Sequence, residues 1–168
     1  LMLWTGVLSW SDITNNKAAW NTFVWFATLV ALADGLSSTG FIAWLGKEGG
    51  ALMSGISPGM ATIVLLLAFY LLHYLFASPT AHTTALLPAM LTIASTIPGM
   101  NMEVFVLLMV TSLGVMGIIT PYGTGPSPIY YGSGYLPTKD YWRVGTIFGA
   151  IFLAALLLIG YPWMSMMF

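Results

Sequence analysis

The chain alternates between long apolar stretches and short clusters of glycine, proline and hydroxyl residues. An apolar run of about 17–25 residues is long enough for a helix to cross the hydrocarbon core of a membrane. Four of the stretches approach or exceed this length, and the clusters between stretches are of the kind that ends helices or forms turns. The stretches are residues 20–45, 60–77, 84–97, 104–119 and 144–168, and the clusters are Gly49-Gly50, Ser57-Pro58-Gly59, Pro98-Gly99 and residues 120–128.

This pattern predicts an all-α integral membrane protein, and the composition agrees. Charged residues make up 5% of the 168 residues and hydrophobic residues 58%, whereas roughly 25% of a soluble domain is charged. Nine charges cannot coat a soluble surface, and four Lys and Arg residues cannot neutralise a nucleic-acid backbone. The chain has no Cys, which excludes disulfide frameworks and thiolate metal sites.

The few basic residues predict an orientation. Lys17 precedes the first stretch, and Lys139 and Arg143 precede the last. The positive-inside rule places these three residues in the cytoplasm. The first stretch then runs outward, and the second and third must together return to the outer side. Two full spans or one re-entrant hairpin would both satisfy this requirement.

The connection between the second and third stretches favours the hairpin. Residues 76–85 contain hydroxyls, one Pro and one His but no charge, unlike a loop at a membrane surface. Pro79 disfavours helical backbone at the residue before it. Non-helical backbone at membrane depth is tolerated where protein buries it or where it lines a wet cavity. We therefore expect a re-entrant hairpin over residues 58–98, with its tip near the middle of the membrane.

A second break follows the fourth stretch. Residues 120–128 contain three Pro and two Gly, which no helix accommodates, yet residues 129–135 continue as an apolar, aromatic segment. The pattern predicts one membrane span over residues 103–135 that is broken in the middle into two half-helices.

Two unwound polar elements resemble the binding architecture of secondary transporters. Half-helix N-termini attract anions, freed carbonyls can coordinate cations, and hydroxyls complete a site without a buried charge. No metal-spaced cluster or cofactor motif is present. The candidate hydroxyl donors are Ser78, Thr80, Thr120 and Thr124.

Each of these features also has a structural interpretation. The breaks could be kinks, and Ser and Thr in membrane helices commonly bond their own backbone or a neighbouring helix. His73 is expected at a protein interface, whereas His82 could serve either role. Asp34 and Glu103 are ionisable residues at or near the membrane, and such residues hint at function. Two further patterns favour packing roles: Gly145 and Gly149 fit a close helix contact, and Trp4, Trp10, Trp20, Trp142 and Trp163 fit interfacial aromatic belts.

The two breaks resemble those of a known family. Ser78-Pro79-Thr80 between apolar helices, the run from Thr120 to Pro128 and the following Tyr130-Tyr131-Gly132-Ser133-Gly134-Tyr135 resemble the divalent anion/sodium symporter family. Within it, the chain is similar to the exchanger branch of 2-oxoglutarate/malate translocators and citrate or tartrate/succinate antiporters. Residues 16–35 and 140–145 fit the same branch, so the resemblance covers essentially the whole chain.

The resemblance implies a fold of two inverted repeats in which a transport domain moves like an elevator against a scaffold. The chain matches the C-terminal repeat only, so we expect the N-terminal repeat to be absent from it and the complete protein to form a homodimer. The implied parts are a scaffold helix (18–45), the re-entrant hairpin (58–98), the broken helix (103–135) and a final helix (141–168).

Residue by residue, the resemblance implies a carboxylate site formed by Ser78, Pro79, Thr80, Thr120, Pro121 and Thr124. Pro79 stands where the family motif has Asn, and Tyr74 stands where sodium-coupled members place a Thr near the ion. Both departures put a sodium site in doubt.

The functional expectation is therefore secondary transport of di- or tricarboxylates by sodium-independent exchange. Sodium-coupled symport and a non-transporting membrane assembly module are the alternatives. No arrangement typical of an enzyme is present. The expected partners are a small carboxylate, membrane lipid and the N-terminal repeat, and the expected location is the bacterial inner membrane, or the plastid inner envelope in a eukaryote.

Overall fold

The computed structural model describes residues 1–17, 20, 23–24, 27–28, 31, 35 and 38–168. Most of the expected scaffold helix over residues 18–45, and Asp34 within it, lies outside the described residues. Within them the secondary structure is helical, with no strand. The helices are α1 (Trp10–Thr14), α3 (Phe41–Leu52), α4 (Pro58–Leu72), η1 (His73–Leu75), α5 (Pro79–Ser95), α6 (Met102–Val115), η2 (Met116–Ile119), α7 (Ser127–Gly132), α8 (Thr138–Ala155), the π-helical turn η3 (Leu156–Gly160) and α9 (Tyr161–Met167).

Three segments are long and apolar enough to cross a membrane. They are Pro58–Leu75, Met102–Ile119 and Thr138–Met167, of 18, 18 and 30 residues. These spans confirm the prediction of an all-α integral membrane protein. The last span starts at Thr138, three residues before its expected start, because the chain turns helical directly after Pro137.

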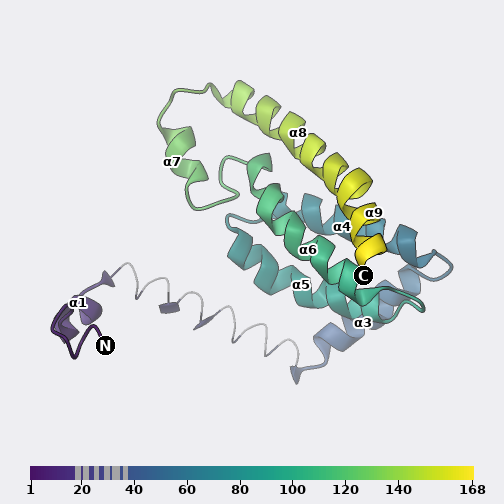
Figure 1. Ribbon diagram of the computed structural model, residues 1–168, viewed down its shortest axis with the longest axis horizontal. Coiled ribbons are helices and arrows are strands. Elements are labelled where there is room, and N and C mark those ends of the chain that lie inside the picture. Colours follow the sequence, from purple (N-terminus) through teal and green to yellow (C-terminus); the bar gives the residue numbers. More distant parts are fainter. Residues whose placement is uncertain (18–19, 21–22, 25–26, 29–30, 32–34, 36–37) are drawn as a thin grey trace.

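The helices α4 and α6 begin side by side at one end of the molecule (Figure 1). Ser57 caps α4 by accepting a hydrogen bond from the Met60 amide at 3.4 Å, and Asn101 caps α6 through the Val104 amide at 3.1 Å. A Cβ atom added to Gly99, just before α6, would lie 3.6 Å from the Pro58 ring. The helix α4 with its turn η1, and the helix α6 with its turn η2, each span 18 residues. Because the two helices start side by side and have the same length, they end at about the same level.

Packing between α4, α5 and α6 forms the core, with η2, η3 and α9 closing it. The turn between α4 and α5 reverses the chain, so these two helices form a hairpin (Figure 1). Lipid tails are as apolar as the side chains, so burial away from lipid gives no hydrophobic driving force. In a membrane these contacts therefore stabilise the fold through close van der Waals packing. The largest apolar side chains with no more than 1% exposure are Tyr70, Phe69, Phe105, Leu66, Leu108, Met109 and Met116.

The prediction that Gly49-Gly50 breaks the chain is wrong, because both residues lie inside α3. Their lack of a side chain is used for packing instead. A Cβ atom at Gly46 would lie 2.5 Å from the Thr92 methyl group, one at Gly49 2.6 Å from Ile93, and one at Gly50 would overlap the Thr96 hydroxyl. The three glycines therefore let α3 lie directly on α5, the arrangement that small residues spaced by four permit.

The expected close contact at Gly145 and Gly149 is confirmed. A Cβ atom at Gly145 would lie 2.7 Å from the Ile118 carbonyl oxygen, and one at Gly149 would lie 2.6 Å from the Ile119 side chain. The Tyr70 hydroxyl also donates to the Gly149 carbonyl at 3.1 Å. The two glycine contacts hold α8 against η2, the turn that leads into the second break, and the tyrosine bond joins α8 to α4.

Candidate functional site

The tip of the hairpin is a short break between η1 and α5. Phe76 and Ser78 have extended backbone, and α5 starts at Pro79. The Ser78 hydroxyl accepts a hydrogen bond from the Ala81 amide at 3.1 Å and so caps α5. Pro79 occupies the first helical position, where an amide proton would have no partner within the helix. The proline therefore favours the start of α5, while the preceding turn η1 has already ended at Leu75.

The predicted tip residues differ in their exposure. Ser78 and Pro79 are half-buried, while Thr80 is exposed. The Ser78 oxygen accepts the Ala81 amide proton, so its own proton can still be donated elsewhere. Thr83 and Thr84, one turn further, donate to the carbonyls of Pro79 and Thr80 instead. Ser78 and Thr80 are thus the hydroxyls that the tip presents.

The second break is a longer irregular segment from Thr120 to Pro126. Thr120 is extended, and the Gly123 amide donates to its carbonyl at 3.4 Å. The Thr124 hydroxyl accepts from the amide of Ser127, the first residue of α7, at 3.3 Å and lies 2.6 Å from the Ser127 hydroxyl. Sequence reasoning predicted Thr124 as a ligand donor and did not anticipate this contact with the start of α7.

The structure brings the two breaks together. His73 Nε2 lies 3.0 Å from the Gly123 carbonyl oxygen, and the Tyr122 hydroxyl donates to the Tyr74 carbonyl at 3.0 Å. Since a carbonyl can only accept, His73 Nε2 carries the proton. The turn η1, directly before the hairpin tip, and the second break therefore each supply a donor to a carbonyl of the other. Sequence reasoning expected His73 at a protein interface, and the structure places it inside this chain, buried against Gly123. Nothing in the sequence singled out Tyr122.

Gly123 is where the unwound segment comes closest to its neighbours. A Cβ atom there would lie 2.8 Å from the Gly117 carbonyl oxygen, 2.8 Å from the Thr120 hydroxyl and 2.9 Å from His73 Nε2. Real Cβ atoms do not approach other atoms this closely. Only glycine fits this position without a shift of backbone.

A cluster of buried polar side chains lies behind the two breaks. His73, His82 and Thr120 are fully buried, and the His73 and His82 rings are 5.1 Å apart. The Thr120 hydroxyl, His73 Nδ1 and both His82 nitrogens have no hydrogen-bond partner. Of the predicted site residues, Thr120 and Pro121 are therefore covered in this conformation, whereas Thr124 is half-buried.

Aromatic side chains pack together beside the two breaks. The Tyr74 ring is nearly parallel to that of Trp142, with centroids 6.3 Å apart, and Tyr122 meets Trp142 edge-on at the same distance. Trp142, which the sequence assigns to an interfacial belt, thus connects the start of α8 to both breaks.

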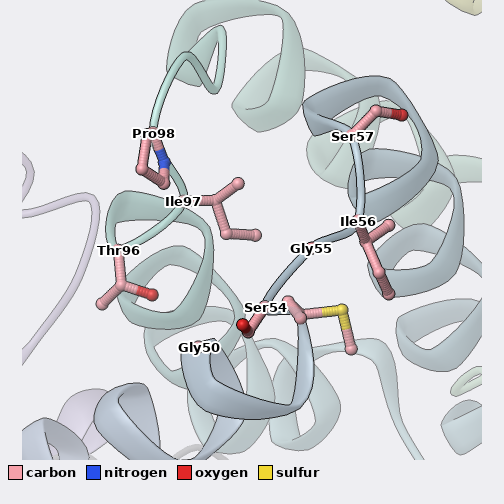
Figure 2. Close-up of a pocket in the computed structure, with 9 residues that line it drawn as sticks. Gly50, Ser54, Gly55, Ile56, Ser57, Thr96, Ile97 and Pro98 are labelled. Atoms are coloured by element: carbon pink, nitrogen blue, oxygen red, sulfur yellow. The ribbon is translucent and has the colours of Figure 1, made fainter.

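The two cavities with described linings lie away from the breaks. The larger, of about 430 Å³, opens between the end of α3 and the end of α5, and Figure 2 shows Thr96, Ile97 and Pro98 facing Gly50 and Ser57 across it. The smaller, of about 260 Å³, lies between the starts of α4 and α6 and α9. Neither is lined by a charged residue or by a predicted site residue.

Metal ligation finds no support in the part of the chain that the structure describes. No group of three or more His, Cys, Asp or Glu side chains lies close enough there to hold a metal ion.

Glu103 lies in the first turn of α6, where a carboxylate complements the positive end of the helix dipole.

Comparison with known proteins places the chain in a family. The family described as "Sodium:sulfate symporter transmembrane region" matches residues 1–168. Proteins named L-tartrate/succinate antiporter from Escherichia coli (strain K12) and Shigella boydii serotype 4 (strain Sb227) are both 54% identical over 164 residues, 98% of this chain and 34% of each relative. The antiporter of Escherichia coli strain UTI89 is 53% identical over 166 residues, 99% of this chain and 34% of its own length.

The chain thus spans about a third of the length of the curated relatives it matches. The relatives and the family carry the names of transporters and not of enzymes. An Escherichia coli relative is consistent with a bacterial inner membrane, and the three candidate spans with an integral membrane position. The chain belongs to the sodium:sulfate symporter transmembrane family, the divalent anion/sodium symporter family of integral membrane transporters that its two breaks resemble.

Proposed function

We propose that the complete protein exchanges one di- or tricarboxylate for another across the membrane, and that this chain is its C-terminal repeat. The observation that carries the proposal is the meeting of two unwound polar elements at one level of the spans, joined by the His73 and Tyr122 hydrogen bonds. The 54% identity to proteins named L-tartrate/succinate antiporter supports antiport and favours tartrate and succinate among the acids.

The proposed substrate site lies where the hairpin tip meets the unwound segment. Ser78 and Thr80 donate hydroxyl protons to a substrate carboxylate at the N-terminus of α5, where the helix dipole favours negative charge. Pro79 holds the first turn of α5 in place. Thr120, Pro121 and Thr124 shape the opposite wall, where Thr120 is buried and Thr124 half-buried.

The proposed architecture follows from the family. The hairpin of α4 and α5 is re-entrant over residues 58–98, and the broken helix covers residues 103–135. With the scaffold helix (18–45) and the final helix (141–168) these parts make one of two inverted repeats. A second repeat supplies the other half of the site, the transport domain moves like an elevator, and the complete protein is a homodimer surrounded by lipid.

Sodium independence is part of the proposal. A sodium site needs several oxygen ligands, and Pro79 has no side-chain oxygen to offer. The carbonyls of Gly123 and Tyr74 already accept hydrogen bonds from side chains of this chain. Too few ligands remain at these breaks to replace the water around a cation.

Counterflow in proteoliposomes tests this function. The complete purified protein is reconstituted with unlabelled tartrate inside, and uptake of labelled succinate is followed with sodium, potassium or choline as the external cation. We expect equal uptake in all three cations and negligible uptake into vesicles without internal carboxylate. Absence of exchange with every di- and tricarboxylate tried would refute the proposal.

Sodium-coupled symport is the second candidate, because the description of the matching family names a sodium:sulfate symporter. It predicts uptake into vesicles that contain no carboxylate and a steep dependence on sodium concentration. The cation series of the counterflow assay separates the two candidates.

A further inference from the structure

Two hydrogen bonds of opposite direction join the hairpin to the unwound segment. His73, in the turn before the hairpin tip, donates to the Gly123 carbonyl, and Tyr122, in the unwound segment, donates to the Tyr74 carbonyl. In each segment the donor residue directly precedes the acceptor residue in the sequence: His73 precedes Tyr74, and Tyr122 precedes Gly123. Both bonds join the same two short stretches of chain, so each of them restrains the distance between the two segments.

Packing fixes the geometry of both donors. The His73 ring meets the His82 ring edge-on at 5.1 Å, and His82 is in turn enclosed by Phe69 and Phe76, with ring centroids 4.3 and 5.0 Å away. His73 is fully buried, so water does not compete for its proton. Tyr122 is held edge-on against Trp142.

Both acceptors are main-chain carbonyls released by the breaks. A carbonyl beside an irregular segment lacks the partner that a continuous helix would give it, and leaving it unpaired in an apolar setting is costly. In a transporter such carbonyls commonly face a bound cation. Here a side-chain N–H and a side-chain O–H take that place for Gly123 and Tyr74.

We propose that His73 and Tyr122 are positioning residues that form a built-in brace: they hold the hairpin and the unwound segment together as one rigid unit during transport, without a bound cation. The proposal rests on the proposed exchange function for its transport readout, but the brace itself is measured without transport. Neither residue needs to touch the substrate.

The test measures the distance between the two segments in the complete protein with its other cysteines removed. Spin labels are attached at Leu75→Cys, which replaces a 77% exposed side chain in η1, and at Gly125→Cys, where a Cβ atom meets nothing within 4 Å. The variants are His73→Ala, His73→Gln and Tyr122→Phe. His82→Phe is the matched control, because it replaces an equally buried imidazole that makes no hydrogen bond to the unwound segment.

We expect a broader and longer label–label distance distribution in His73→Ala and in Tyr122→Phe, with the wild-type distribution retained in His82→Phe. His73→Gln should restore it, since the Gln amide can donate at the position of Nε2. Exchange of succinate for tartrate should slow by about tenfold in His73→Ala and recover in His73→Gln. Tyr122→Phe removes a single oxygen from a partly exposed side chain and serves as the test if His73→Ala does not fold.

An unchanged distance distribution in the folded variants that lack a donor would overturn the brace, as would broadening by His82→Phe equal to that by His73→Ala. Changed distances in a protein that exchanges no carboxylate would support the brace and refute the proposed function alone. Normal exchange with unchanged distances would refute the brace and support the proposed function.

Discussion

The two breaks of this chain are built in different ways. The hairpin break covers three residues, 76–78, and its neighbours satisfy it: the Phe76 amide donates to the His73 carbonyl at 3.0 Å, and Ser78 caps α5. The second break covers seven residues, 120–126, and depends on His73, in the turn η1 before the hairpin tip, for the donor to its Gly123 carbonyl. A short break is thus specified by the residues beside it, whereas a long one takes its shape from the structure packed against it.

This difference predicts where substitutions do most damage. Changes in the hairpin tip should act mainly on the substrate and on the local cap. Changes in the unwound segment should act on stability, because its backbone lies against η2 and His73. The following substitutions in the complete protein test the distinction.

The largest effect is expected for Gly123→Ala. The added methyl group would meet a main-chain oxygen and two buried polar atoms within 2.9 Å. The segment must therefore shift, at a cost of about 3 kcal/mol or more. Thermal unfolding of the detergent-solubilised protein checks this, with Gly125→Ala as control because its methyl group meets nothing within 4 Å. Equal unfolding temperatures for the two variants would contradict the close contact.

A smaller effect, on affinity, is expected for Ser78→Ala and Thr80→Ala. Each removes a hydroxyl proposed to bind a carboxylate, a hydrogen bond worth about 1.5–3 kcal/mol, so the half-saturating succinate concentration should rise roughly ten- to a hundredfold. Thr146→Ala is the control, because this exposed hydroxyl bonds the Trp142 carbonyl of its own helix. A similar rise in all three variants would indicate general damage.

The smallest effect is expected for Gly117→Ala, about 1–2 kcal/mol of stability. Its methyl group would overlap only the Thr124 side-chain methyl, and the nearest backbone atom of the loop, the Gly123 carbonyl oxygen, is 3.9 Å away. Thr124→Ser removes that methyl group and keeps the hydroxyl that accepts the Ser127 amide proton. The double variant should regain most of the lost stability, and additive losses would show that the two residues do not touch.

Sequence reasoning predicted the features that residues close together in the sequence specify by themselves. Ser78-Pro79 is a helix-start signal, and three prolines with two glycines cannot form a helix, so both breaks could be placed from the sequence. The Gly145–Gly149 contact was predictable for a similar reason, because the spacing of the two glycines is itself the signal.

The remaining features depend on contacts between distant residues. Gly49 and Gly50 were expected to break the chain, but α5 packs against them and keeps α3 continuous. His73 and Gly123 are 50 residues apart, and Tyr122 and Tyr74 are 48 apart. No pattern within a single sequence marks such pairs. The burial of Thr120 follows from the same tertiary packing, and so could not be predicted.

The central claim, that the two breaks form one substrate site, is tested most directly by protection of single cysteines from a maleimide. Thr80→Cys and Gly125→Cys put a thiol at an exposed position of each break, and Leu136→Cys, 51% exposed before α8, is the control. The account predicts that succinate slows modification at Thr80→Cys and Gly125→Cys with the same half-saturating concentration, and leaves Leu136→Cys unaffected. Protection of one break without the other, or of neither, would contradict it.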